Sequence, residues 1–438
     1  MSETSSHSSD FEYSAVPQES RKGFWSMLVV MLGFTFFSAS MWSGATLGTG
    51  MTFKGFLWSV MAGNLILGAY TGILALIAAR TGDSIHILAK YSFGEKGSYL
   101  PSFLLGITQV GWFGVGVAMF SLPVQTFLKE NGFEWASSDG ALWAINIVFG
   151  LLMTSTAYFG IKSLTILSYV AVPAIIVLGG FSSFKALGTS FDGQSGWDVL
   201  INHQPAAGAM IGATTAIAIS IGSFISGGSC TPDFVRFAKN GKIAVITTVI
   251  AFFLGNSLMF FFGAVGTMTY GVNDISDVLF KQGLLSFAII ALGLNIWTTN
   301  DNAIYTSGLG FSNITGFPKR YTVLFNGILG TVLAMWLNNH FVSYLAFLNT
   351  IIPPVGAVII ADYFIRNRAK YAEYKDAKFQ LVSLPAVIAW ACGAIVARVN
   401  VGVTAINGMI VAAVVYLVLA SICPKCKKCS CSCCEESK

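Results

Sequence analysis

Charged residues are scarce in this sequence. Asp, Glu, Lys and Arg together make up only 10% of its 438 residues, whereas 54% are apolar. A soluble domain carries about 25% charged residues, so the composition excludes a soluble enzyme and favours a protein that crosses a membrane many times. At roughly 20 residues for each crossing plus a short connection, the length allows about twelve membrane-spanning helices.

The apolar segments also contain almost no residues for acid–base chemistry. No Glu and no His falls in the core of a predicted span, and Asp301 is the one acidic candidate there. A membrane enzyme needs a cluster of such groups, so this class of protein is disfavoured. The four histidines lie at the edges of spans or in loops: His7, His86, His203 and His340.

Long apolar runs are what the sequence has in abundance. Twelve runs begin near Phe24, Gly55, Leu100, Ala141, Ser163, Gly208, Ile243, Leu284, Tyr321, Phe341, Leu381 and Gly402. Inside a bilayer each backbone polar group must be satisfied by the protein itself, so we expect these runs to be helices. The predicted fold class is therefore an all-α polytopic membrane protein with twelve transmembrane helices.

The basic residues predict how these helices are oriented. Twelve helices divide the connections into two alternating sets, and 20 of the 25 Lys and Arg residues fall in the set that includes both termini. Positively charged loops stay in the cytoplasm. We therefore expect both termini to be cytoplasmic. The N-terminal region lacks the short apolar core and cleavage site of a signal peptide.

The chain ends in a cluster of cysteines. Six of the eight cysteines fall in the sequence CPKCKKCSCSCC of the tail. A dispensable disordered tail is the favoured interpretation, with binding of zinc or copper(I) and acylation as alternatives. The predicted order is a disordered cytoplasmic arm (1–22), helices one to five (23–187), an extracytoplasmic loop (188–206), helices six to ten (207–365), a cytoplasmic loop (366–380), helices eleven and twelve (381–422) and the cysteine-rich cytoplasmic tail (423–438).

Glycine and small polar residues gather in two spans at matching places. These segments, Gly33–Gly50 and Gly222–Phe237, belong to the first helix of each of two five-helix blocks. Because five is odd, the second block enters the bilayer from the opposite side, as an inverted repeat requires. We favour broken helices, whose unwound backbone can bind an ion or a polar solute. Close packing of small residues is the alternative.

Polar side chains that suit such a break lie in two other spans. Asn295 lies three and four residues before Thr298 and Thr299, so the three share one face of a helix. Their neutral oxygens suit a small cation, which favours sodium, and coupling to protons through Asp301 is the alternative. Gln109 and Trp112 are three residues apart, and they combine an amide with a large aromatic surface.

Seven segments, in order, resemble the nucleobase–cation symporter family: FTFFSASMWSGATLGTG, TQVGWFGVGVAMF, GSFISGG, DFVRF, FFLGNSLMF, LGLNIWTTNDNA and IPPVGAVIIADY. The resemblance runs from about Val16 to about Phe364. It implies a leucine-transporter-type fold, with a five-plus-five inverted repeat, broken helices 1 and 6 and two extra helices. It also implies sodium-coupled import of cytosine by alternating access, in a bacterial inner membrane. The sequence departs from the family at Gly228–Pro232, where we expect an effect on the gate.

The resemblance also implies the site residues. The substrate set is Gln109, Trp112, Ser223, Phe224, Ser226 and Asn295, and the sodium set is Gly33, Phe36, Asn295, Thr298 and Thr299. Cytosine would lie between the rings of Trp112 and Phe224, and sodium would be bound by backbone carbonyls and threonine hydroxyls. The expected partners are cytosine, sodium and the lipid bilayer, with no catalytic residue, resident cofactor, nucleic acid or obligate protein partner.

Two alternatives to this function remain open from the sequence. The first keeps the transporter but changes its ligand to another nucleobase or to a ring such as hydantoin or allantoin. The second is a channel built on broken helices, which would show neither saturation nor accumulation against the driving gradient.

Overall fold

Helices make up most of the described residues in a computed structural model, which describes residues 11, 14–159, 161–206, 208–272, 275–399 and 401–422. In chain order they are α1 (Phe24–Thr35), α2 (Ser38–Gly50), α3 (Phe53–Thr81), α4 (Ile85–Phe93), α5 (Tyr99–Glu130), α6 (Asp139–Tyr158), α7 (Ile161–Gly188), α8 (Gly196–Ile201), α9 (Ala213–Gly222), α10 (Ile225–Ser229), α11 (Thr231–Val235), α12 (Gly241–Ile250), α13 (Asn256–Tyr270), α14 (Ile275–Lys281), α15 (Leu285–Thr315), α16 (Lys319–Asn339), α17 (Phe341–Ile351), α18 (Pro353–Ala361), α19 (Leu384–Val396) and α20 (Thr404–Ile422). Short 3₁₀ turns lie at Gln18–Ser20 and Glu134–Ser137, π-helical turns lie at Ala251–Gly255 and Asp362–Arg366, and β1 (Ser190–Phe191) pairs antiparallel with β2 (Gln194–Ser195).

Fewer helices than the twelve predicted are long and apolar enough to cross a membrane by themselves. In the part of the chain that the structure describes, eight helices are long and apolar enough to cross a membrane, or nine if the bent pair α1 and α2 counts as one crossing. The predicted spans at α9 and α19 are short, apolar helices. Helix α15 has 31 residues, but it carries the polar run Asn295–Asn302. The figure of twelve crossings therefore stays a prediction.

Local sequence sets where several helices begin and end. The side chain of Thr52 accepts a hydrogen bond from the backbone of Gly55, and Ser84 caps α4 in the same way through Ile87. Such caps satisfy amide groups that the first turn leaves free. Helix α3 ends at Gly82, whose φ of 82° is a left-handed conformation that glycine adopts without strain.

Two segments are divided inside the molecule. Helices α1 and α2 are separated by Phe36 and Phe37 and bent by 52° relative to each other. Ser223 and Phe224 separate α9 from α10, and Cys230 separates α10 from α11. Both divisions fall within the segments in which the sequence places glycine and small polar residues. Backbone groups at these points are therefore free from regular helical pairing.

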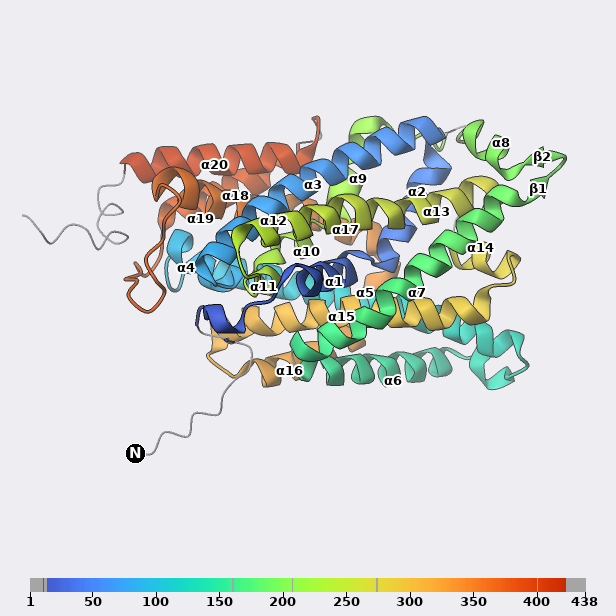
Figure 1. The fold of residues 1–438 in the computed structure, drawn as a ribbon, viewed down its shortest axis with the longest axis horizontal. Coiled ribbons are helices and arrows are strands. Elements are labelled where there is room, and N and C mark those ends of the chain that lie inside the picture. Colours follow the sequence, from blue (N-terminus) through green and yellow to red (C-terminus); the bar gives the residue numbers. More distant parts are fainter. Residues whose placement is uncertain are drawn as a thin grey trace, which may run out of the picture.

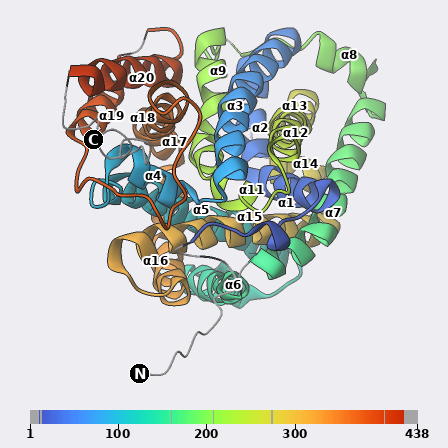
Figure 2. The same cartoon turned by 60° about the vertical axis from the view of Figure 1, so that its left-hand side comes forward.

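Helices α5 and α15 run side by side through the middle of the molecule, as Figures 1 and 2 show. Helices α6 and α16 pack beside them, while α3, α12 and α13 lie nearby on another side. Helices α17 to α20 form a further group (Figure 2). The two divided segments thus lie against the central pair, and the interior they share is where a binding site has to be sought.

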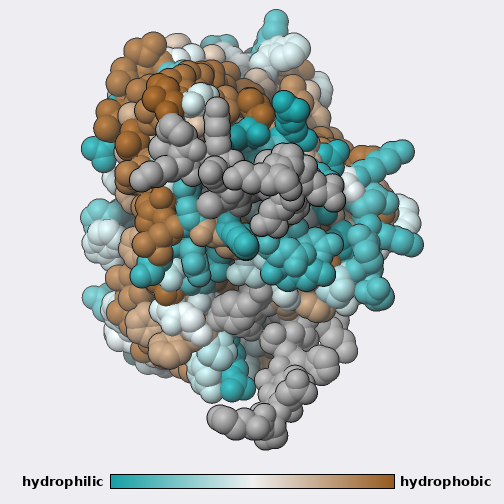
Figure 3. Space-filling view, turned by 90° about the vertical axis from the view of Figure 1, so that its left-hand side faces the viewer, coloured by the Kyte–Doolittle hydropathy of each residue, from teal (hydrophilic) through white to brown (hydrophobic). Residues whose placement is uncertain are grey.

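The two ends of the molecule differ in which segments they hold. Residues 14–22, α4, the 366–380 segment and the last turn of α20 lie at the left of Figure 1, whereas α8, β1 and β2 lie at the right. Figure 3 views the left end, where hydrophilic residues gather and hydrophobic residues lie at the margins. The segments at this end belong to the set of connections that holds most of the basic residues. Their common placement agrees with the predicted topology.

The N-terminal arm is not disordered throughout, so the prediction for residues 1–22 is wrong for 14–22. The Val16 amide donates to the carbonyl of Gly82 at 2.9 Å, and Arg21 Nη1 donates to the carbonyl of Ala79 at 2.6 Å. Lys22 pairs with the backbone after α11 through a hydrogen bond of 2.6 Å to the Phe237 carbonyl. The arm is ordered because Val16 is buried and its polar neighbours bind helix ends. The cysteine-rich tail lies outside the described residues.

Close packing of α2 against α13 depends on glycine. A Cβ atom on Gly263 would overlap the carbonyl group of Met41, whereas one on Gly180 in α7 would meet nothing within 4 Å. We predict that Gly263→Ala lowers the free energy of unfolding by about 1–3 kcal/mol, because a packed interior has no room for the methyl group. Thermal unfolding of the purified protein in detergent measures this. Gly180→Ala is the matched control and should unfold no earlier than the parent; equal unfolding of both variants would contradict the packing argument.

Candidate functional site

A small cavity lies where the divided segments meet α5 and α15. Its volume is about 20 Å³, room for about one water molecule. The residues that line it are Phe34, Phe37, Gln109, Trp112, Ser223, Phe224, Gly227, Thr299, Asn300 and Ala303. Four of the six predicted substrate residues are among them. Ser226 lies one layer behind the wall, and Asn295 faces elsewhere.

Aromatic rings form much of the wall. The ring of Phe37 lies edge-to-face with Trp112 at 5.6 Å between centroids and with Phe224 at 6.4 Å. Phe34 also contacts Phe224 edge-to-face, at 5.1 Å. The ring of Phe37 thus contacts both rings, Trp112 and Phe224, that the family resemblance implies as the walls around a ligand. Nothing in the sequence distinguishes Phe34 or Phe37, because each is one of 35 phenylalanines and only the fold shows where it points.

Trp112 is held from its other side by α17. Its ring lies edge-to-face with Phe341 at 5.9 Å and with Tyr344 at 5.6 Å. The Tyr344 hydroxyl donates to the backbone carbonyl of Thr108 on α5. Phe341 also contacts Trp42 of α2, at 5.9 Å. Helix α17 therefore covers the cavity on the side where α2 lies.

The polar part of the wall comes from α5 and the break before α10. Gln109 Nε2 donates to Ser226 Oγ at 2.8 Å, and Ser226 Oγ lies 2.7 Å from Thr108 Oγ1. Ser223 donates to the carbonyl of Ser220 at 2.9 Å. The oxygen of Gln109 and the acceptor side of Ser223 Oγ are available to hydrogen-bond a ligand in the cavity, because no described residue donates to them. Gly227 lies beside them with Phe34 and Phe224 too near to admit a side chain.

Asn295 holds the division between α1 and α2. Its Nδ2 donates to the carbonyl of Phe36, and its Oδ1 accepts from Ser38 Oγ at 2.9 Å. One amide therefore satisfies backbone and side-chain groups on both sides of the break. Asn295 does not line the cavity in this structure, whereas the family resemblance implies a role for it in substrate binding.

The residues of the predicted sodium set come together beside this amide. Thr298 Oγ1 lies 3.5 Å from the carbonyl of Gly33 and donates to the carbonyl of Asn295 at 2.7 Å. Thr299 donates to the same carbonyl of Asn295 at 3.0 Å. The carbonyl of Phe36 contacts the Asn295 amide. Carbonyl and hydroxyl oxygens from α1 and α15 are thus clustered, and hard oxygen donors suit a small cation.

Asp301 lies on a different face of α15. Its Oδ1 accepts from Thr156 Oγ1 of α6 at 2.6 Å, and Trp297 donates to the same hydroxyl at 2.8 Å. Its Oδ2 is buried with no hydrogen-bond partner among the described residues. The carboxyl group does not line the cavity. It is therefore separate from the oxygens near Gly33.

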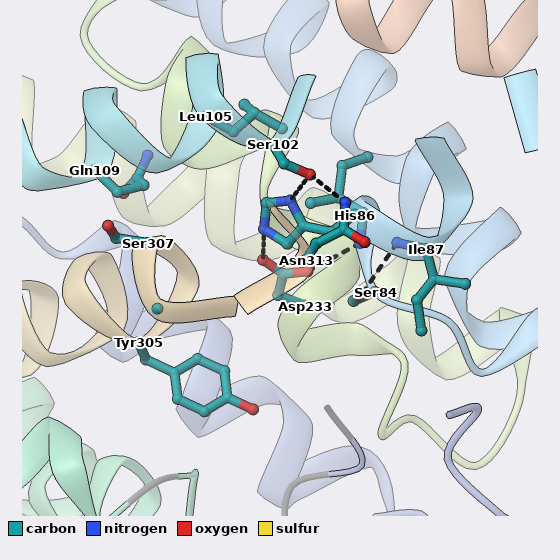
Figure 4. A network of polar contacts seen from close by, with 12 residues as sticks. Ser84, His86, Ile87, Ser102, Leu105, Gln109, Asp233, Tyr305, Ser307 and Asn313 are labelled. Carbon is teal, nitrogen blue, oxygen red and sulfur yellow. Dashed lines mark hydrogen bonds and ion pairs between the residues drawn. The ribbon is translucent and has the colours of Figure 1, made fainter. Parts of the chain in front are cut away.

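A polar network closes the molecule at the end that carries the N-terminal arm (Figure 4). His86 of α4 contacts Ser102 Oγ through Nδ1 at 3.2 Å and Asp233 Oδ2 through Nε2 at 3.7 Å. Asn313 donates to Ser102 at 2.9 Å, and the amide of Ile85 donates to Asp233 Oδ1 at 2.9 Å. Burial lowers the pKa of His86 to about 3, so its ring is neutral at physiological pH. The network joins α4, α5, α11 and α15.

Arg236 extends this closure to the N-terminal arm. Its guanidinium donates to the carbonyl of Phe11 at 2.9 Å and to the hydroxyl of Tyr305 on α15 at 3.5 Å. Phe234 packs against Tyr305 with ring centroids 6.2 Å apart. Phe234 of α11, Arg236 directly after it, Tyr305 of α15 and the backbone of the arm therefore lie together on the side from which α1 begins.

We predict that Asn295→Ala lowers the free energy of unfolding by about 1–3 kcal/mol, because it leaves the Phe36 carbonyl and the Ser38 hydroxyl buried without partners. Thermal unfolding in detergent is the measurement. Asn131→Ala is the control, since Asn131 is exposed and bonds only within its own helix end. A stability of Asn295→Ala equal to that of the control would show that the amide does not hold the break.

Comparison with known proteins gives consistent matches along the whole chain. A family model described as permease for cytosine/purines, uracil, thiamine, allantoin matches residues 15–427. The cytosine permease of Escherichia coli K12 is 50% identical over 420 residues, which cover 95% of this chain and 96% of that permease. A purine-uracil permease of Arabidopsis thaliana is 24% identical over 368 residues, which cover 75% of this chain and 59% of that protein.

Solved structures resemble the fold. One is a nucleobase-cation-symport-1 family transporter in a closed conformation with bromovinylhydantoin bound, with a TM-score of 0.76, 20% identity and coverage of 94% of this chain and 96% of that one. Another is a substrate-bound, outward-open sodium-coupled sialic acid symporter, with a TM-score of 0.69, 12% identity and coverage of 97% and 93%. These likenesses show a transporter fold of the predicted type. Together with the family match they establish that this chain is an integral membrane transporter, not an enzyme, and that it belongs to the family of permeases for cytosine/purines, uracil, thiamine and allantoin.

Proposed function

We propose that this chain is a sodium-coupled symporter that imports cytosine by alternating access. The observation that carries the proposal is that neighbouring residues of α15 belong to the aromatic cavity and to the cluster of oxygens. Thr299 lines the aromatic cavity, and its neighbour Thr298 lies beside the Gly33 carbonyl in the cluster of oxygens. The 50% identity to a cytosine permease supports cytosine as the substrate.

The chemistry of the cavity suits a flat, uncharged ring. Aromatic side chains bind a nucleobase by stacking, at about 1–3 kcal/mol for each base in nucleic-acid binders. Trp112 and Phe224 supply the faces, and Gln109 and Ser223 supply polar groups for the ring edges. A buried site built to hydrogen-bond one pattern rejects a ring with the opposite pattern, because its polar groups would be left unpaired.

Cytosine cannot occupy a cavity of about 20 Å³ without movement of its walls. The cavity is covered by α17 on the α2 side and by the Arg236 network on the α1 side. We propose that these two covers are the gates, which open in turn. Phe37, which now fills the space between Trp112 and Phe224, would move aside as the base binds.

Sodium would provide the driving force. One charge that moves through 100 mV releases about 2.3 kcal/mol, which corresponds to roughly 50-fold accumulation of a neutral substrate. The cation would replace the hydrogen bonds of Thr298 and Thr299 at the Asn295 carbonyl and would contact the carbonyls of Gly33 and Phe36. Because Asn295 binds the same break, a cation there would stabilise the cavity wall.

We further propose twelve crossings in a bacterial inner membrane, with both termini in the cytoplasm. In this topology α1 with α2 is one broken crossing, and α9 with α10 and α11 is another. Support comes from the basic residues of the arm, α4 and the 366–380 segment, because these three segments lie at one end of the molecule (Figure 1).

A second candidate keeps the transporter but couples it to protons through Asp301. The observation in its favour is a buried carboxyl oxygen without a hydrogen-bond partner in the described structure. Uptake of labelled cytosine into liposomes, with either a sodium gradient or a proton gradient imposed, separates the two. Sodium-driven accumulation that survives Asp301→Asn supports the first candidate, and proton-driven accumulation that this variant abolishes supports the second. Competition of labelled cytosine uptake by unlabelled uracil, hydantoin, allantoin and purines tests which ring the protein transports.

We predict that Trp112→Ala weakens cytosine binding by at least about tenfold, because it removes one stacking face. Equilibrium binding of labelled cytosine to the purified protein measures this. Trp58→Ala is the matched control, since Trp58 lies 68% exposed on the outside of α3, and it should bind like the parent. Unchanged binding in Trp112→Ala would remove this ring from the site.

We predict that Thr299→Ala raises the sodium concentration needed for half-maximal cytosine uptake, by about tenfold if one ligand worth about 1.4 kcal/mol is lost. The hydroxyl is one of few neutral oxygens in the cluster. Uptake into liposomes over a range of sodium concentrations is the measurement. Thr350→Ala removes an exposed hydroxyl that bonds its own helix and should leave the sodium response unchanged, whereas an unchanged response in Thr299→Ala would exclude it from the ion site.

A further inference from the structure

Glutamine by itself is a poor reader of base identity. Its amide presents an acceptor at one end and a donor at the other, and a half-turn of the amide exchanges them. Cytosine carries an amine next to a ring nitrogen that accepts, whereas uracil carries a carbonyl next to a ring nitrogen that donates. A freely rotating Gln109 would pair with either ring, so discrimination needs something that fixes the amide.

A chain of three hydrogen bonds fixes it. Thr108 Oγ1 lies 2.9 Å from the carbonyl of Leu105, which only accepts, so Thr108 gives its single hydrogen there. At 2.7 Å from Thr108, Ser226 must then donate its own hydrogen to Thr108 Oγ1. Ser226 Oγ can only accept from Gln109, at 2.8 Å, so the nearer end of the amide is the nitrogen.

The reverse orientation is costly because the chain is buried. The exposed fractions of Thr108, Gln109 and Ser226 are 1%, 2% and 0%. With the amide oxygen toward Ser226, Ser226 would donate to Gln109. Thr108 would then either turn its hydrogen from Leu105 to Ser226 or face Ser226 with no hydrogen between the two oxygens. Either arrangement loses one of the three buried hydrogen bonds, which is unfavourable. Leu105 and Gln109 project from neighbouring turns of α5 (Figure 4).

We propose that Thr108 and Ser226 are specificity-determining positioning residues, which hold Gln109 with its oxygen toward the cavity so that the site accepts the amine of cytosine and rejects the carbonyl of uracil. Neither side chain lines the cavity. The second N–H of the Gln109 amide lies next to its oxygen and matches the ring nitrogen beside the amine, as glutamine pairs with adenine in DNA. This inference rests on the proposed function and identifies what sets its substrate preference.

The test measures displacement of labelled cytosine by unlabelled cytosine and uracil from the purified full-length protein in sodium buffer. Thr108→Val keeps the shape of the side chain and removes the hydroxyl, which frees Ser226 to donate toward Gln109. We expect the preference for cytosine over uracil to fall by at least about tenfold, mainly through tighter uracil binding. Ser226→Ala should reduce the preference in the same way. Thr108→Ser restores the hydroxyl and should keep it.

Ser121→Ala is the matched control. Ser121 is buried on the same helix and bonds only the carbonyl of Val117, so its loss should leave the preference unchanged. An unchanged preference in Thr108→Val or Ser226→Ala overturns the inference. So does loss of cytosine binding in both variants with no gain in uracil binding. A parent protein that binds no cytosine refutes the proposed function itself, which distinguishes the two failures.

Discussion

The site depends on the hydrogen bonds that one amide side chain makes to a break between two helices. Asn295 of α15 donates to the carbonyl of Phe36, in the gap between α1 and α2, and accepts from Ser38, the first residue of α2. Without such a partner, the backbone groups freed at the gap would be buried and unpaired. The bend of 52° between the helices is therefore stabilised from a neighbouring helix. Phe34, near the end of α1, and Phe37, in the gap itself, thereby line the cavity.

The same helix connects the cavity to the cluster of oxygens. One turn of α15 places Thr298 toward the Gly33 carbonyl and Thr299 toward the cavity wall. A cation bound to these oxygens would therefore act on the same residues that shape the space for a ring. Coupling of two ligands needs only that each stabilises the arrangement that the other binds. A shared helix turn and a shared helix break provide that link over a short distance.

Aromatic rings on one side of the cavity and a polar network on the other explain why the protein is closed around it. On one side, Phe341 and Tyr344 of α17 cover Trp112. On the other, Arg236, Tyr305 and the N-terminal arm cover the approach along α1. These covers are built from edge-to-face rings and from neutral or paired polar groups, which separate at a lower cost than a continuous apolar core. Behind the cavity, by contrast, Gln109, Ser226 and Thr108 form a connected chain of hydrogen bonds, which gives this part of the wall a fixed polarity.

The sequence by itself determined the membrane class, the helical character and the two segments rich in glycine and small polar residues, because composition and glycine clusters are local properties of the chain. Only the tertiary structure decided that Asn295 holds a helix break and does not reach the cavity, that Phe37 stands between Trp112 and Phe224, and that residues 14–22 are ordered. It also decided the direction of the Gln109 amide, which follows from Leu105, Thr108 and Ser226. Contacts of this kind join residues far apart in the chain, and no local pattern of a single sequence records which of them will meet.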